Sequence, residues 1–230
     1  NTEMVELLLR HGADPNLFDN IEGYTSLHTG ILSGNPEIVE LLLQHGANAN
    51  LEAKDGIYPF FFAMVMKPHN TLEILRLLLA NNADAGRRVN NMSPLLIAIQ
   101  ENDLEVLSLL LHDAQVNVNT KTSDGTTPLM KACLVGNVEV VRMLLASGAK
   151  PKAHNLKHET ALAMAAKGGF ARVVTALLVA GANPNDLDDD GYSCLMLACG
   201  VQDNIETVEA LINGGASVHT ILEQDKHVIS

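Results

Sequence analysis

The sequence predicts an all-α fold in which small helix-turn-helix units stack into an array, because two short phrases recur along it in phase. The first phrase is Gly-Ala-x-x-Asn, intact at Gly12–Asn16, Gly46–Asn50 and Gly181–Asn185 and altered at four further places. Its last position falls at residues 16, 50, 86, 119, 152, 185 and 219, so successive copies lie 33 to 36 residues apart. A fixed period in this range is typical of a stacked array, not of a globular core with a catalytic cleft.

The second phrase predicts a short first helix in each unit. It reads Thr25-Ser26-Leu27, Ser93-Pro94-Leu95 and Thr127-Pro128-Leu129, with related forms at residues 58, 160 and 193. A Thr or Ser hydroxyl caps the start of a helix, and the fixed φ of proline suits its first turn. The helix that follows is rich in small residues, as in Leu162–Ala166, so a neighbouring helix can approach it closely.

The residues between this helix and the Gly-Ala phrase predict a second, amphipathic helix. Val140, Val141, Leu144 and Leu145 form one such apolar stripe. The glycine that follows, Gly148 in this unit, provides a left-handed C-cap. The remaining residues carry turn chemistry and predict a projecting loop that leads into the next unit.

With these phrases the chain resembles the ankyrin repeat family over essentially its whole length. The resemblance implies an ankyrin-type α-solenoid of stacked helix-turn-helix units with projecting loops. We expect a single array over residues 1–230, with complete units at 21–52, 53–87, 88–120, 121–153, 154–186 and 187–220. Partial units at 1–20 and 221–230 indicate that the array is a fragment of a longer protein.

Composition and motifs predict a protein without catalytic or cofactor chemistry. No nucleophile motif, phosphate-binding loop or dinucleotide fingerprint is present, so we predict no enzyme activity and no cofactor. A zinc site needs four ligands. Neither the pair His154 and His158 nor the pair Cys194 and Cys199 has a second pair of ligands at a suitable spacing in the sequence. The run Asp188–Gly191 lacks the glutamate that closes a calcium loop, so we predict no metal site.

The same composition favours an intracellular, cytoplasmic protein. The three cysteines occupy repeat positions and are interpreted as small core residues in a reducing compartment. The sequence contains no signal peptide and no apolar run long enough for a membrane span. A net charge of −12 argues against general nucleic-acid binding.

Two departures from the repeat carry functional hypotheses. The unit 53–87 contains Tyr58, Phe60, Phe61 and Phe62 and an insertion at residues 66–70. A bulky local core is the interpretation we favour; the alternative is an exposed aromatic anchor for a partner.

The second departure is charge, which is +5 over residues 121–181 and −8 over 182–230. Lys121 and Lys157 fall in projecting loops, and Lys131 and Lys167 on first helices. A solvated surface explains this, as does a basic pocket for an acidic peptide or a phosphate group.

The resemblance implies a protein-protein interaction scaffold, because ankyrin-like proteins are known chiefly for binding a partner peptide or domain on a concave groove. We expect the partner here to present an acidic or phosphorylated segment. The resemblance assigns groove residues by their equivalent positions in successive repeats. Before the first helices these are Tyr24, Ile57, Met92, Thr126, Glu159 and Tyr192. Within the first helices they are Phe62, Ile97, Lys131, Met164 and Leu197, and towards the helix ends Leu32, Gln100, Leu134 and Lys167.

Two other functions remain open. In one alternative, the array is the sensory part of a larger enzyme or channel and itself binds a phosphorylated small molecule. Only the pair Lys131 and Lys167 favours this alternative. The array is otherwise a structural spacer, which burial of the groove aromatics between units would favour.

The resemblance also implies that Asn16, Asn50 and Asn185 are candidates for asparaginyl hydroxylation. From the residues alone, we expect each of these asparagines to tie its own turn with local hydrogen bonds.

Overall fold

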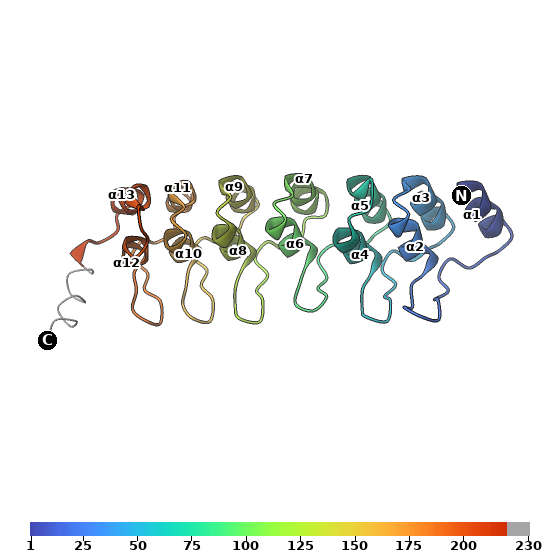
Figure 1. The fold of residues 1–230 in the computed structure, drawn as a ribbon, viewed down its shortest axis with the longest axis horizontal. Coiled ribbons are helices and arrows are strands. Elements are labelled where there is room, and N and C mark those ends of the chain that lie inside the picture. The colour runs from blue at the N-terminus through green and yellow to red at the C-terminus, as the bar shows by residue number, and fades with distance from the viewer. Residues whose placement is uncertain (220–230) are drawn as a thin grey trace. The chain divides into compact units, whose positions relative to one another are not determined.

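The computed structural model describes residues 1–219, and within them the chain is helical, with isolated β-bridges in place of strands. Figure 1 shows the ribbon. The all-α, ankyrin-type fold class predicted from the two phrases is confirmed. The last expected unit, 187–220, is described as far as residue 219, and the partial unit expected at 221–230 lies outside the described residues.

Helices alternate between a first and a second helix of each unit. The first helices are α2 (Ser26–Leu32), α4 (Pro59–Met66), α6 (Pro94–Gln100), α8 (Pro128–Val135), α10 (Ala161–Lys167) and α12 (Cys194–Cys199). The second helices are α1 (Thr2–Arg10), α3 (Pro36–Gln44), α5 (Thr71–Ala80), α7 (Leu104–Ser108) continued by the π-helix η1 (Leu109–Asp113), α9 (Val138–Ala146), α11 (Ala171–Val179) and α13 (Ile205–Asn213).

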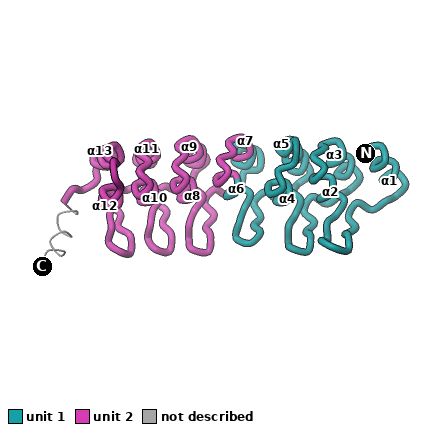
Figure 2. Tube along the Cα trace, in the orientation of Figure 1, with its two compact units in different colours: residues 1–97, 108–116 teal, residues 98–107, 117–230 magenta. Residues whose placement is uncertain are grey.

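The chain divides into two compact units, coloured separately in Figure 2. Unit 1 comprises residues 1–97 and 108–116, and unit 2 comprises residues 98–107 and those from 117 onward. In unit 1, α2 packs on α3 and α4, and α3 packs on α1 and α5. In unit 2, α10 packs on α8, α11 and α12, and α11 packs on α9 and α13. In both units, therefore, a first helix such as α2 or α10 contacts its own second helix and the first helix of the next repeat.

The predicted capping chemistry places the helix starts. The hydroxyls of Thr127, Thr160 and Ser193 each accept the N–H of the residue three positions on, at 3.2 to 3.3 Å. Tyr58 stands at the same position in unit 1 and forms no side-chain cap. Its hydroxyl instead donates to the Arg87 carbonyl at 2.8 Å, so this repeat exchanges the cap for an aromatic side chain that reaches the next loop.

The aromatic run of the repeat 53–87 lies in the core of unit 1. Tyr58, Phe60, Phe61 and Phe62 are all buried. The local-core interpretation is confirmed, and the hypothesis of an exposed aromatic anchor is wrong. Helix α4 is almost uniformly apolar, so it buries most of its circumference against α2 and α5 instead of presenting a stripe to solvent.

The repeat 88–120 contains one extra residue in its second helix and one fewer in its loop. Val116 N–H bonds the Leu110 carbonyl, six residues back, where Ala149 N–H bonds Leu144, five residues back. The π-helix η1 accommodates the added residue. The loop is shortened by a tight turn between Val89 and Met92, in which two asparagines adopt positive φ. The two changes cancel, and the repeat keeps a length of 33 residues.

Asparagines of the Gly-Ala-x-x-Asn phrase join neighbouring repeats. The Asn16 amide donates to the Gly46 carbonyl at 2.9 Å, and the Asn48 N–H donates back to Asn16 Oδ1 at 2.8 Å. The same two-bond bridge recurs from Asn50, Asn119 and Asn185. The expectation of purely local bonds is therefore wrong for these carboxamides, because each spans about one repeat length. Only the backbone N–H groups of Asn16, Asn50 and Asn185 bond within their own turns.

Replacing Asn50 by alanine should lower the free energy of unfolding by about 1 to 2 kcal/mol, because two inter-repeat hydrogen bonds are lost together. Urea unfolding followed by far-UV circular dichroism measures the change. Asn20→Ala is the matched control, since that exposed carboxamide makes no bond, and it should change stability by less than about 0.5 kcal/mol. Equal effects of the two substitutions would show that the bridge contributes nothing.

Candidate functional site

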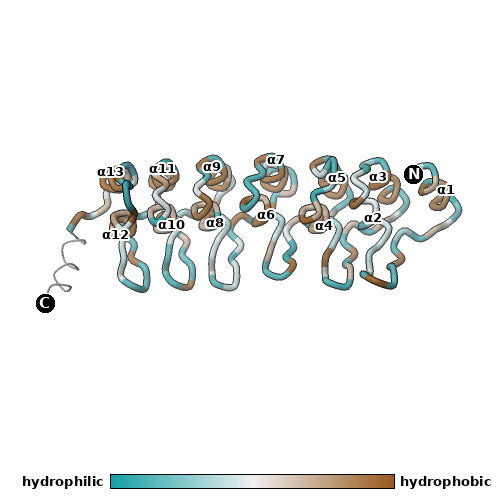
Figure 3. Tube along the Cα trace, viewed as in Figure 1, coloured by the Kyte–Doolittle hydropathy of each residue, from teal (hydrophilic) through white to brown (hydrophobic). Residues whose placement is uncertain are grey.

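The projecting loops are mostly hydrophilic in Figure 3, although the first one also exposes Leu17, Phe18 and Ile21. Aspartates close several of these loops internally. Asp19 accepts the N–H groups of Ile21, Glu22 and Tyr24 at 2.8 to 3.0 Å, and although desolvation opposes it, these bonds lower the Asp19 pKa. Hydrogen bonds from Thr122 and Thr126 lower the pKa of Asp124 to about 2. The loops are thus held in defined conformations, suited to presenting side chains.

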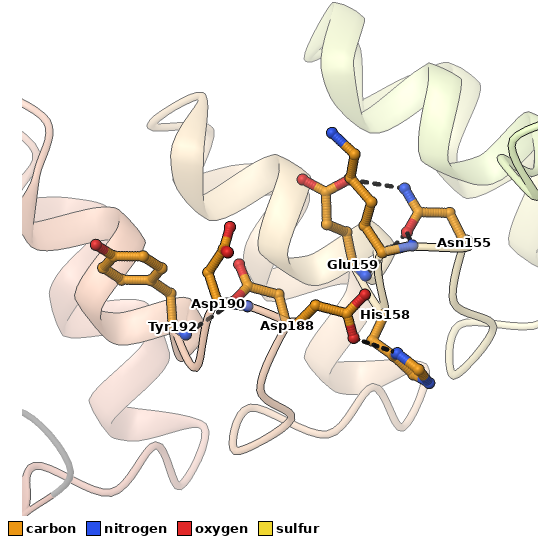
Figure 4. Close-up of polar contacts among 8 residues, drawn as sticks. Asn155, His158, Glu159, Asp188, Asp190 and Tyr192 are labelled. Atoms are coloured by element: carbon orange, nitrogen blue, oxygen red, sulfur yellow. Dashed lines mark hydrogen bonds and ion pairs between the residues drawn. The ribbon is translucent and has the colours of Figure 1, made fainter.

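In unit 2 the loops also bond one another in sequence. Leu156 N–H donates to the Asp124 carbonyl at 3.0 Å, and Asp189 N–H donates to the Lys157 carbonyl at 3.2 Å. The His158 ring lies 2.6 Å from an Asp189 carboxylate oxygen. Figure 4 shows His158 next to the loop that carries Asp188 and Asp190, with Tyr192 at the far end of that loop. Three consecutive loops of unit 2 therefore form one connected surface.

In unit 1 the face of the first helices is aromatic and apolar. Tyr24 stacks on His28 at a centroid distance of 5.4 Å and contacts Phe62 at 5.1 Å. Burial lowers the pKa of His28 below its ordinary value, so this ring is neutral and structural, bonding the Ile57 carbonyl at 3.2 Å. Tyr24 also lines a pocket of about 540 Å³ that reaches Leu8 and Phe18.

In unit 2 the corresponding face combines free lysines with exposed apolar side chains. Lys131 on α8 and Lys167 at the end of α10 have no acidic partner within the described residues. Leu134 is 51 % exposed and Tyr192 48 %. Glu159, half-buried at the base of its loop, accepts the Asn155 amide at 2.7 Å, which Figure 4 shows. This face can offer both an ammonium group and an apolar contact to the same ligand.

The structure divides the predicted groove residues into two groups. Four are interior: Phe62, Ile97, Thr126 and Met164, with exposed fractions of 3, 8, 3 and 7 %. A partner on a groove cannot reach these four side chains as they stand, so their assignment to an open groove is wrong. Phe62, for example, is covered by Tyr24 and His28 of the preceding repeat. The others are half-buried or exposed: Tyr24, Leu32, Ile57, Met92, Gln100, Lys131, Leu134, Glu159, Lys167, Tyr192 and Leu197. Their role in binding stays a prediction.

One cysteine prediction also fails. Cys133 and Cys194 are buried, and burial raises the pKa of both thiols, whereas Cys199 is exposed. Cys199 lies in α12, and within the described residues no further first helix packs over that side of it.

Sequence reasoning missed the contacts that link one repeat to the next. Besides the asparagine bridges, Arg87 pairs with Glu52 and lies over the Tyr58 ring, and Lys54 donates to the Asn20 and Ile21 carbonyls. The recurrence of asparagine at one phase was the available signal, but it does not reveal which atoms it bonds.

Comparison with known proteins agrees with this geometry. The family model for ankyrin repeats, in sets of three copies, matches residues 1–55, 61–155 and 147–221. The chain belongs to the ankyrin repeat family. The crystal structure of the human ASB11 ankyrin repeat domain superposes with a TM-score of 0.73 at 27 % identity, covering 94 % of this chain and 97 % of that one.

Curated ankyrin repeat proteins resemble the chain over part of their length. Mouse Rabankyrin-5 is 33 % identical over 154 residues, which is 64 % of this chain and 13 % of that protein. The human transient receptor potential cation channel subfamily A member 1 is 37 % identical over 83 residues, or 36 % of this chain and 7 % of the channel. The chain thus spans a small fraction of these relatives.

Ankyrin repeats are in general non-catalytic modules of protein-protein interaction. Between residues 1 and 219, no three His, Cys, Asp or Glu side chains are grouped as metal ligands. Nor does any helix in that part of the chain have the length and apolar character needed to cross a membrane.

Proposed function

We propose that this array is a scaffold that binds a partner protein through the first helices and projecting loops, with the decisive contacts in unit 2. The observation that carries the proposal is the pair of lysines without an acidic partner, Lys131 and Lys167, together with the exposed Leu134 on the helix of Lys131 and the exposed Tyr192 in the loop before α12. Such a mixture fits a partner segment with acidic or phosphorylated residues next to an apolar one. Because the loops are hydrogen-bonded to one another, binding requires little ordering of the receptor.

Reversing both charges, Lys131→Glu with Lys167→Glu, should weaken partner binding by about 2 to 5 kcal/mol if these ammonium groups pair with buried anions of the partner. The thermal midpoint should hardly change, because exposed charges contribute little to folding. Isothermal titration with an acidic peptide panel and with the natural partner, once it is recovered by pull-down, measures the affinity.

The matched control is Arg142→Glu with Arg172→Glu. It makes the same change of net charge in the same two repeats, but on the second helices α9 and α11, where both arginines are exposed and have no acidic partner among residues 1–219. Equal loss of affinity in the two double variants would indicate a general effect of charge. A large loss of stability in the lysine variant would show instead that these lysines belong to the stack.

A second candidate function is sensing of a phosphorylated small molecule for a larger enzyme or channel. The same unpaired lysines favour it, and a cation channel is among the similar proteins. Titration with small organic phosphates separates the two functions: tight binding of a small phosphate to the lysine face, with no affinity for acidic peptides, supports the second candidate over the first.

A further inference from the structure

One junction between repeats of unit 2 lacks the asparagine bridge, because Lys152 stands at the position that is asparagine at 16, 50, 119 and 185. In the bridged junctions the carboxamide oxygen accepts a backbone N–H of the next repeat, as Asn119 accepts that of Lys150 at 2.9 Å. The equivalent N–H at the Lys152 junction belongs to Asn183. No acceptor for it is present within residues 1–219.

Lysine can replace only half of the missing bridge. The ammonium group has three donors and no acceptor. Lys152 can therefore donate to the Gly181 carbonyl, which is the acceptor in the equivalent bridges, but it cannot accept the Asn183 N–H. Asn183 is exposed, so water satisfies this donor in the free chain and a ligand can take the place of that water.

The surroundings of this open N–H include basic side chains and one carboxylate. Asn183, Lys152, His154, His158 and Asp186 line one pocket of about 380 Å³. Lys121, Lys150, Lys152 and His154 line another of about 540 Å³. Lys152 and His154 belong to both, so the two pockets adjoin at Lys152.

Within residues 1–219, two lysines at this surface lack an acidic partner, whereas the acidic groups are hydrogen-bonded. The ammonium groups of Lys150 and Lys152 have no acidic partner within the described residues, while Lys121 donates to the His154 carbonyl at 2.9 Å. The acidic groups that face the site are already bonded: Asp186 accepts the Asn183 side-chain amide at 2.5 Å, and Asp189 pairs with His158. The Asn183 N–H and the ammonium groups of Lys150 and Lys152 are therefore the groups at this surface that an added anion can bond.

We propose that the Lys152 junction binds a phosphate monoester carried by a partner polypeptide. A phosphate monoester presents about two negative charges and three acceptor oxygens, enough for the Asn183 N–H and the Lys152 ammonium group, which line the same pocket. This surface lies where the second helices end and the projecting loops begin. It does not include Lys131 or Lys167, the first-helix lysines of the proposed function, so the two sites are tested separately.

The test is a titration of the ¹⁵N-labelled chain with a short uncharged peptide that contains one phosphoserine, followed by amide chemical shifts. We expect saturable shifts largest at the Asn183 amide. Lys152→Asn restores the bridge and removes a cation, so it should weaken binding about tenfold or more. The same variant should unfold at an equal or higher temperature, so weaker binding would not reflect misfolding.

Three comparisons complete the test. Arg142→Ala, on helix α9, removes an exposed cation from the same repeat as Lys152 and should leave the peptide affinity unchanged; an equal loss there would overturn the assignment to this junction. The unphosphorylated peptide should not bind, and inorganic phosphate should bind more weakly than the phosphopeptide; equal affinity of either would overturn the assignment to a phosphorylated partner. Absence of a shift at Asn183, or full affinity in Lys152→Asn, would overturn the site itself.

Discussion

Replacing Phe60 by alanine should lower the free energy of unfolding of unit 1 by about 3 to 5 kcal/mol. Phe60 is fully buried in α4, a helix that packs on both α2 and α5, so truncation leaves a cavity that helices on two sides cannot fill. Urea unfolding followed by the helical circular dichroism signal measures the loss. It is the largest effect we expect from a single side chain in this chain.

Met66→Ala is the control for Phe60→Ala. Met66 ends the same helix but is 46 % exposed, so its truncation should cost less than about 1 kcal/mol. If the two substitutions were equally costly, the aromatic run would not be the core of this repeat.

Replacing Gly125 by alanine should destabilise unit 2 for two independent reasons. Gly125 has a φ of +81°, which costs an L-residue with a side chain about 1 to 2 kcal/mol. An added Cβ would also lie 2.9 Å from the Leu156 backbone nitrogen in the next loop. Backbone cannot rotate away as a side chain can, so this overlap should add about 1 to 3 kcal/mol.

Gly148→Ala separates the two contributions. Gly148 has a similar φ of +86°, but nothing lies within 4 Å of the added Cβ. Its substitution should therefore show the dihedral cost alone. Thermal and urea unfolding of both variants measures the difference, and equal destabilisation would mean that the loops of unit 2 separate freely.

The helices and their ends could be predicted from the sequence because they depend on nearby residues. Thr127 and Ser193 cap the helices they precede, and Gly148 and Gly181 adopt the positive φ expected after a second helix. These features act over three or four residues, within reach of a local pattern. The recurring period of 33 to 36 residues gave the expected position of each unit.

The surface was harder to predict, because exposure depends on neighbours a full repeat away. Lys131 and Met164 stand at equivalent positions of two successive repeats, yet Lys131 is half-exposed and Met164 is 7 % exposed. Phase gave the position on the helix but not the size of the side chains that cover it. The open Asn183 N–H was likewise invisible, since it depends on an atom that Lys152 does not have.

The π-helix η1 has a consequence for how such a chain changes over generations. A residue inserted into an α-helix rotates everything after it by about 100°, which would turn an apolar stripe away from its neighbours. Here the wide turn at Leu109–Asp113 absorbs the added residue where it enters, and the turn at Asn90 and Asn91 removes one elsewhere. The length of the repeat, 33 residues, therefore does not reveal that an insertion and a deletion are both present. Gains and losses of single residues can thus accumulate in pairs inside one repeat while every later repeat keeps its phase.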